Sequence, residues 1–263
     1  MRHYHGTPLG GTRDSVARFM AQGNRSFLVP FNRPEDMPIV SESSRGFVLD
    51  NGAFSAWKKG EPITDWKPYY DWCKELHQNP RFDFAVIPDV IDGSEEENRE
   101  LFSKWFKGCR LPAHYGWVKG SPVWHMHESF DQLRYFMQHS EIISIGSSGQ
   151  YSKPGTRAWH QRMGEAMQVL CDSNGRPLRK IHGLRMLSPR IVERYPFHSA
   201  DSTNVAQNSQ LLTRFGMYAP PTQSQRREVL ASRIEATQSP SAYKATRQPT
   251  LFNLSEKPEV SNG

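Results

Sequence analysis

The feature that most constrains this chain is a repeated order of apolar run, polar turn and amphipathic segment. Runs at 46–50, 83–89 and 142–146 are apolar almost throughout, which is typical of strands buried on both faces of a parallel sheet. Each run stops at glycine or a polar side chain, and a predicted helix follows. About seven or eight such units predict an α/β fold, and their number favours a (β/α)8 TIM-type barrel over a doubly wound sheet.

Two of the predicted helices carry a start signal of their own. Ser94 followed by Glu97 is a capping box, and Ser129 followed by Gln132 marks a second helix start. The acidic residues 95–97 suit the positive end of a helix. We therefore interpret them as helix electrostatics and not as metal ligands.

The candidate functional residues stand at the ends of the predicted strands. They are Asp50, Asp89, His127, Gly146, His182 and Asp201. The carboxyl ends of all strands of a barrel meet at one face, so these residues would ring one pocket. Asp201 follows a predicted strand at 197–200 and precedes a helix, so it either reacts in the pocket or caps that helix. Asp50 likewise either faces a ligand, which the small residues after it let approach closely, or only forms a turn.

The charge of the chain favours a polyanionic partner, of which nucleic acid is the commonest. The 263 residues carry a formal net charge of +6, and the sequence pI is about 9.3. The three cysteines, Cys73, Cys109 and Cys171, are scattered without metal-ligand spacing. Such a set suits core thiols in a reducing compartment.

We expect no metal, no cofactor and no membrane partner. His125, His127, His182 and His198 lie at or near predicted strand ends, but their spacing is not that of a metal site. The mean hydropathy is −0.69, and the chain lacks both an apolar run long enough to cross a bilayer and an apolar N-terminal signal segment. These features predict a cytoplasmic protein.

The composition changes after about residue 218, which predicts a catalytic barrel at 1–218 and a basic tail at 219–263. A short helix is expected over 225–236, with disorder beyond Gln238. Gln248, Leu251 and Phe252 form a Gln-x-x-Leu-Phe peptide. It resembles the peptide that docks bacterial DNA-processing proteins onto the replication sliding clamp, and a chance match is the alternative.

Five short motifs at the predicted strand ends occur in an order that resembles a known family. They are 49–54 (LDNGAF), 87–92 (IPDVID), 145–149 (IGSSG), 182–184 (HGL) and 200–204 (ADSTN). The series resembles the tRNA-guanine transglycosylase superfamily. It looks closest to the compact phage and bacterial branch that places deazaguanines in DNA, the DpdA-type enzymes. The resemblance spans about residues 46–208.

The resemblance implies a (β/α)8 barrel that breaks the N-glycosidic bond of a base in a polynucleotide. Asp201 is implied to be the nucleophile that attacks the sugar C1′, and Asp50 the residue that handles protons. Asp89 is implied to hold the base edge, while Gly146 and Ser147 contact the base.

Further residues are assigned to the base and to the nucleic acid. His127 or a neighbour stands where tRNA-acting members carry a base-binding glutamine, and Phe54 closes the first motif as a further base-binding candidate. Contacts to the nucleic acid, phosphates included, are expected from Lys153, Arg157, Arg185 and Asn204.

The chain departs from the tRNA-acting members because it lacks their zinc site of clustered cysteines and a histidine. DNA is therefore favoured over tRNA, with the target nucleotide flipped or single-stranded. The leading hypothesis is an enzyme that exchanges a DNA guanine for a 7-deazaguanine. One alternative is a DNA glycosylase that leaves abasic sites, for example in defence against phage. Another is a barrel that binds nucleic acid without catalysis.

Overall fold

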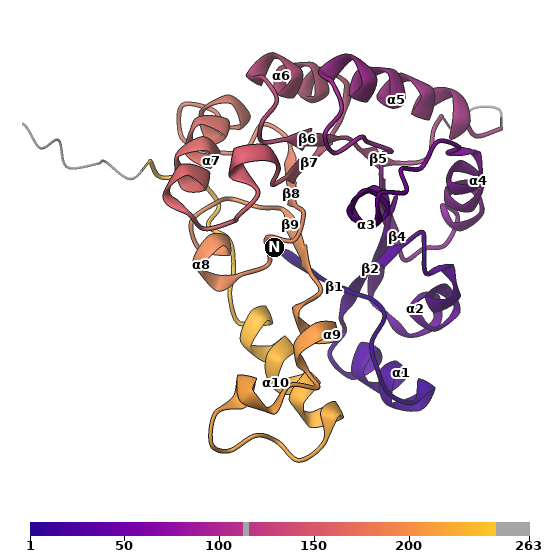
Figure 1. Ribbon diagram of the computed structural model, residues 1–263, viewed down its shortest axis with the longest axis vertical. Coiled ribbons are helices and arrows are strands. Elements are labelled where there is room, and N and C mark those ends of the chain that lie inside the picture. Colours follow the sequence, from indigo (N-terminus) through magenta and orange to yellow (C-terminus); the bar gives the residue numbers. More distant parts are fainter. Residues whose placement is uncertain (113–115, 246–263) are drawn as a thin grey trace, which may run out of the picture.

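The computed structural model describes residues 1–112 and 116–245, and this part of the chain forms an α/β structure around one parallel sheet (Figure 1). The strands are β1 (Arg2–Gly6), β2 (Ser26–Pro30), β3 (Gly46–Asp50), β4 (Phe82–Val86), β5 (Gly120–Ser121), β6 (Val123–His125), β7 (Ile142–Gly146), β8 (Lys180–Gly183) and β9 (Ser199–Ser202). All neighbouring strands are parallel, in the order β5-β4-β3-β2-β1-β9-β8-β7-β6.

Helices follow the strands along the chain and surround the sheet (Figure 1). They are α1 (Arg13–Gln22), α2 (Met37–Ser43), α3 (Ala53–Lys59), α4 (Lys67–Leu76), α5 (Glu95–Gly108), α6 (Phe130–His139), α7 (Arg157–Leu170), α8 (Pro189–Val192), α9 (Asn204–Asn208) and α10 (Gln223–Glu235), with 3-10 turns η1 (Pro34–Asp36), η2 (Gly149–Tyr151) and η3 (Leu212–Phe215). The predicted alternation of strand and helix is confirmed.

The sheet curls into a nearly closed barrel, and its two end strands are joined by one residue, Pro122. On one side the Ile87 amide donates to the Ser121 carbonyl at 2.9 Å. On the other side the Ser144 amide donates to the Pro122 carbonyl at 2.9 Å. β5 pairs with β4 and β6 pairs with β7, so the ring continues on both sides of Pro122. Because these pairs are parallel, the carboxyl ends of the strands converge on one face.

Two apolar cores lie on the two faces of the sheet. The larger one packs strand residues such as Phe27 and Phe47 against helix residues such as Trp105 and Trp159. The smaller one consists of buried strand residues, namely Tyr4, Leu28, Val48, Phe84, Val86, Val123 and Ile142. Because side chains alternate between the faces of a strand, this second set fills the interior of the barrel.

Both helix-start predictions are confirmed. The Ser94 hydroxyl accepts from the Glu97 amide while the Glu97 carboxylate accepts from the Ser94 amide, and α5 begins there. The Ser129 hydroxyl accepts from the Gln132 amide at the start of α6. These caps form because each partner lies three residues away along the chain.

The strand predicted at 197–200 is shifted, and this decides between the two interpretations of Asp201. β9 runs from Ser199 to Ser202, so Asp201 lies inside the strand. The amide of Asn204 at the start of α9 donates to the Ser202 hydroxyl, not to Asp201. The helix-capping interpretation of Asp201 is therefore wrong, because its side chain is held elsewhere.

The expectation of disorder beyond Gln238 is wrong for residues 239–245, which pack on the barrel. The Tyr243 amide donates to the Gly175 carbonyl at 2.7 Å, and the Tyr243 ring stacks on Tyr195 with centroids 5.9 Å apart. The helix expected at 225–236 is α10, which begins two residues earlier and packs against α1 and α9 (Figure 1). The clamp-like peptide with Gln248 and Phe252 lies outside the described residues.

Candidate active site

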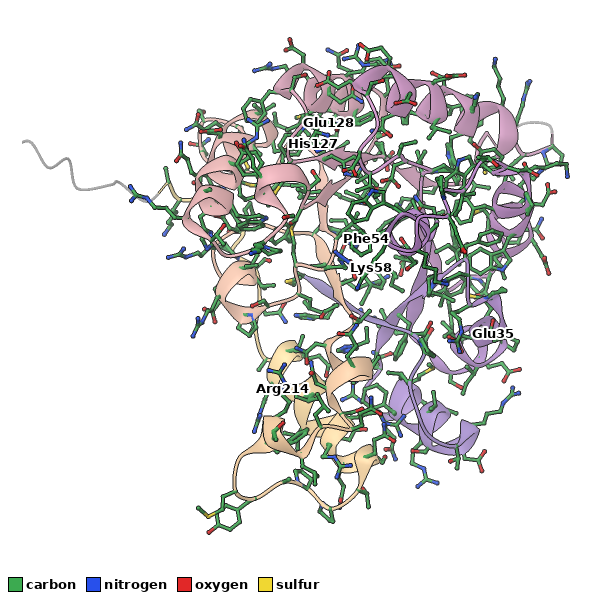
Figure 2. All side chains as sticks on the ribbon, viewed as in Figure 1. Glu35, Phe54, Lys58, His127, Glu128 and Arg214 are labelled. Atoms are coloured by element: carbon green, nitrogen blue, oxygen red, sulfur yellow. The ribbon has the colours of Figure 1, made fainter. Side chains whose placement is uncertain are left out.

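A cavity of about 690 Å³ opens at the carboxyl ends of the strands, and three carboxylates line it. Asp50 ends β3, Asp89 follows β4 and Asp201 lies in β9. Helix α3 follows β3 directly and lies over the ring in the view of Figure 1. Its residues Phe54 and Lys58 line the cavity and are labelled in Figure 2.

The cavity brings together most, but not all, of the residues that the sequence singled out. Those that line it are Asp50, Asp89, Asp201, Gly146, Ser147, Phe54 and Arg185. Those that lie outside its lining are His127, His182, Lys153, Arg157 and Asn204. His127 is instead hydrogen-bonded through Nδ1 to the Ser148 hydroxyl at 2.7 Å.

His125 occupies the place in the cavity that we expected for His127. β6 ends at His125, and the chain then turns, with the Glu128 amide donating to the His125 carbonyl at 2.8 Å. His125 lies two residues after Val123 and so projects from the same face of the strand toward the interior of the barrel. His127 has the same spacing of two, so the sequence pattern alone does not choose between the two histidines, and the end of β6 at His125 decides it.

Asp50 has a carboxyl group whose pKa lies far above its ordinary value. Burial raises its pKa to about 7, and the neighbouring charges of Asp201 and Asp89 act in the same direction. The Gly52 amide and the Arg185 guanidinium only partly oppose this shift. The side chain is half-buried and faces the cavity, so Asp50 can exchange protons with a bound molecule near neutral pH.

Asp89 is buried and held by two neighbours. The side-chain amide of Asn51 donates through Nδ2 to Oδ1 of Asp89 at 2.7 Å and also to the Ile87 carbonyl at 2.8 Å. The Nε2 atom of His125 lies 2.9 Å from Oδ2, within ion-pair distance, although its angle falls short of a hydrogen bond. Burial lowers the pKa of His125, but Asp89, with Glu128 nearby, outweighs burial and the net shift is upward.

Asp201 is buried at the wall of the cavity, where a main-chain amide donates to it and an imidazole lies nearby. The Arg185 amide donates to its Oδ1 at 2.8 Å, and Nε2 of His182 lies 3.5 Å from the same oxygen. The other nitrogen of His182 bonds the Ser199 hydroxyl at 2.9 Å. These partners orient the Asp201 carboxylate toward the cavity without covering it, because the residue still lines the cavity.

Arg185 adopts an unusual backbone and a stacked side chain. Its φ is +56°, a left-handed conformation that arginine seldom adopts. Its guanidinium carbon lies 3.5 Å from the centroid of the Phe54 ring. Burial against the cavity wall lowers the pKa of Arg185. The charges of Asp201 and Asp50 act in the opposite direction but do not outweigh burial, so the net shift is downward. Strain of this kind is typical of functional sites, where the surrounding structure imposes it.

The cavity has a charge gradient from its floor to its rim. The three carboxylates lie at the strand ends. Of the cations, Arg33 lies directly before η1, and Lys58 and Lys59 lie in the last turn of α3. Sequence reasoning missed these cations, as it missed Asn51, because nothing local to them marks a pocket. Such a cavity suits a ligand with a negatively charged exterior and a neutral or developing positive centre.

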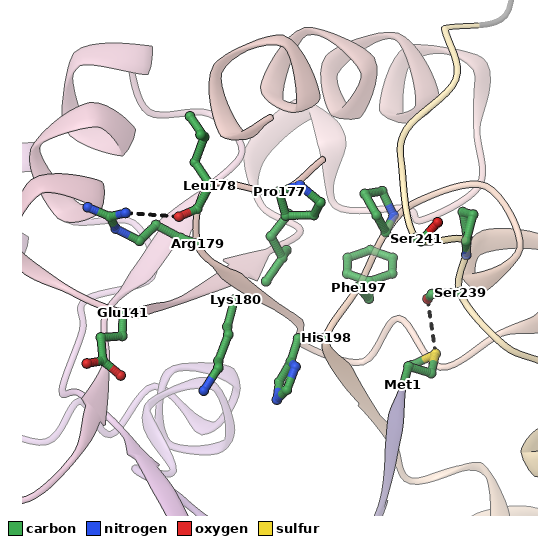
Figure 3. Close-up of a pocket in the computed structure, with 13 residues that line it drawn as sticks. Met1, Glu141, Pro177, Leu178, Arg179, Lys180, Phe197, His198, Ser239 and Ser241 are labelled. Atoms are coloured by element: carbon green, nitrogen blue, oxygen red, sulfur yellow. Dashed lines mark hydrogen bonds between the residues drawn. The ribbon is translucent and has the colours of Figure 1, made fainter. Parts of the chain in front are cut away.

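A second cavity of about 610 Å³ lies at the opposite end of the barrel, where β8 begins (Figure 3). Lys180, His198 and Met1 line it, and Glu141 is the single carboxylate of its lining. We therefore place the candidate active site at the other end, where three carboxylates meet.

Within residues 1–112 and 116–245, no group of three or more histidine, cysteine, aspartate or glutamate side chains could hold a metal ion. In the same part of the chain, no helix combines the length and the apolar character needed to cross a bilayer. A scan against protein-family models, a search of curated proteins and a search of solved structures each find no match to this chain.

Proposed function

We propose that this protein breaks the N-glycosidic bond of a base in DNA, with Asp201 as nucleophile, and exchanges guanine for a 7-deazaguanine. The observation that supports this proposal is the meeting of Asp50, Asp89 and Asp201, from three separate strand ends, in one cavity. The five motifs that resemble the transglycosylases include all three aspartates.

The first step needs a carboxylate under the sugar and a proton for the base. The Asp201 carboxylate attacks C1′ and forms an ester bond while the C1′–N bond breaks, and its electron pair goes to the base. Asp50, whose pKa is about 7, gives its proton to the departing base. The negative charges of the cavity floor stabilise the oxocarbenium character of the sugar.

In the second step Asp201 becomes the leaving group and Asp50 becomes the base. A nitrogen of the incoming 7-deazaguanine attacks C1′, the ester bond to Asp201 breaks, and Asp50 takes the proton that the nitrogen loses. Asp89 would accept from the donors on the base edge. Since Asn51 and His125 already hold both its oxygens, it has only its remaining lone pairs to offer.

We infer that the barrel is of the (β/α)8 TIM type. β5 and β6 are separated only by Pro122, and counting them as one strand leaves eight strand positions in ring order. The carboxylates lie at the carboxyl ends of the strands, where TIM-barrel enzymes carry their active sites.

A DNA glycosylase is the second candidate. Asp50 is partly exposed to solvent in the cavity, so water can reach the position that an incoming base would occupy. Water would then release the sugar from Asp201, and an abasic site would remain. The two candidates share the first step and differ only in the second nucleophile.

Mass spectrometry of nucleosides tests the proposal. DNA and tRNA are incubated with the protein, with and without a 7-deazaguanine, and both the polymer and the released bases are analysed. We expect guanine release from DNA and incorporation of the added base. Abasic sites without added base would support the glycosylase instead.

Substitution of the nucleophile gives the matched control. Asp201→Asn should abolish base release and the trapped protein–DNA adduct, whereas Asp131→Asn, on the exposed start of α6, should retain both. No base release and no adduct with the unchanged protein on either polymer would end the proposal. If the Asp201→Asn variant keeps the biological effect of the unchanged protein, covalent chemistry is not the function and the non-catalytic barrel is favoured.

A further inference from the structure

We propose that one face of α3 binds single-stranded nucleic acid next to the nucleotide that occupies the cavity. We call the α3 face the side chains of Phe54, Trp57 and Lys58, which share one side of the helix, together with Lys59 at its C-terminal end. The inference rests on the proposed function, and it adds the form of the polymer and the surface that holds it.

The aromatic part of the α3 face is exposed and yet held in place. Trp57 is 43% exposed, which is unusual for a side chain of its size. Its indole nitrogen donates to Oδ2 of Asp92 at 2.7 Å, and its ring centroid lies 5.5 Å from that of Phe54. A large ring that is both exposed and oriented offers a stacking surface at little entropic cost.

The cationic part of the α3 face is free to meet phosphates. Lys58 and Lys59 are exposed at the end of α3 and line the cavity rim. Neither forms an ion pair with any residue in 1–112 or 116–245. By contrast, Arg33 on the same rim pairs with Glu35 at 2.6 Å. No carboxylate in the described part of the chain therefore competes with a phosphate for either lysine.

The α3 face continues directly into the cavity. Phe54 and Lys58 are four residues apart, so they lie on the same side of the helix, and both line the cavity (Figure 2). Gly60, with a φ of +75°, ends the helix immediately after the lysines. A strand whose base enters the cavity would therefore pass over Trp57 and the lysines as it leaves.

The chemistry of the α3 face favours a single strand over a duplex. Stacking on Trp57 requires an open base face, which a paired and stacked base does not offer. A base must also leave the duplex before a barrel pocket can reach it. Aromatic rings between cations are the combination that binds single strands with little sequence preference.

Binding of a fluorescent single-stranded DNA oligonucleotide of about 20 nucleotides, measured by anisotropy over a range of salt concentrations, tests the inference on the full-length protein. Lys58→Gln/Lys59→Gln should reduce the slope of log affinity against log salt by about 1.4, because each phosphate that is no longer neutralised lowers the slope by about 0.7. Trp57→Ala should weaken binding about 5- to 150-fold, and Trp57→Phe should restore most of it.

The matched control is Lys104→Gln/Lys107→Gln, which removes the same charge from exposed residues of α5 outside the cavity lining and should leave the salt slope unchanged. All positions are exposed, so thermal melting should not change. Normal affinity and slope in the α3 variants, or equal affinity of the unchanged protein for the matching duplex, would overturn the inference. Tight strand binding without base release or adduct would instead contradict the proposed function alone.

Discussion

Asp50 is the residue whose ionisation the rest of the cavity controls. Burial and two like charges raise its pKa to about 7, whereas the Arg185 amide donates to Asp201 and Nε2 of His182 lies 3.5 Å from the same oxygen. The proposed acid and the proposed nucleophile are thus residues of one type in two different environments.

The rate of base departure should therefore depend on pH around the pKa of Asp50. Asp50 is protonated below about pH 7 and loses its proton above it, so the single-turnover rate should fall about tenfold per unit well above pH 7. Asp50→Asn should be slower by about 10²- to 10⁴-fold and should lose this dependence. A profile that is flat from about pH 6 to about pH 9 in the unchanged protein would exclude Asp50 as the acid.

Helix α10 shows how an element far along the chain is fastened to the barrel. Arg25 is buried, and its guanidinium bonds Glu228 and Glu235 of α10 at 2.8 Å each. The Nε2 atom of His5 in β1 lies 2.8 Å from the same oxygen of Glu235. The barrel supplies the buried cation and α10 supplies two partly exposed anions, so without α10 Arg25 would be an uncompensated buried charge.

The docking of α10 should weaken in acid. Burial alone would raise the pKa of Glu235, but His5 and Arg25 outweigh it and lower the pKa to about 2. A carboxylate with a lowered pKa stabilises the fold fully above its unfolded value of about 4.3 and loses that contribution as pH falls toward about 2. Glu235→Gln should reduce the free energy of unfolding at pH 7 by about 1–3 kcal/mol.

Urea unfolding at pH 7 and at about pH 3 measures this contribution. The loss of stability between the two pH values should be smaller in Glu235→Gln than in the unchanged protein. Glu165→Gln, which removes a more exposed ion pair with Arg162 on α7, serves as the control and should change stability by less than about 1 kcal/mol. Equal pH dependence in all three proteins would contradict this account of α10.

At the scale of the whole molecule, the cavity lies at one end of the barrel and the chain continues past residue 245. The sequence predicts that Gln248, Leu251 and Phe252 dock the protein onto a replication sliding clamp. Leu251→Ala/Phe252→Ala should then abolish clamp binding, measured by surface plasmon resonance, and leave base release from a free oligonucleotide unchanged. Clamp binding that survives this double substitution would point to a chance match.

The local features of the fold could be predicted because their causes are local. Ser94 and Glu97 cap a helix from three residues apart, and the apolar run at 46–50 forms a strand with the predicted bounds. The tips that carry Asp50, Asp89 and Asp201 could be placed on one face because parallel strands end together. The assignment of a family and of a reaction remains a prediction.

What only the tertiary structure decided depends on partners that are distant in the chain. His125 and not His127 enters the cavity because the strand ends there and turns. Residues 239–245 pack on the barrel because Tyr243 finds Gly175 and Tyr195. The sequence by itself determined which segments become strands and helices, since spacing and caps act over a few residues. The ring closure, the facing side chains and the ion pairs between Arg25 and α10 required the folded chain, because those contacts form only when remote segments meet.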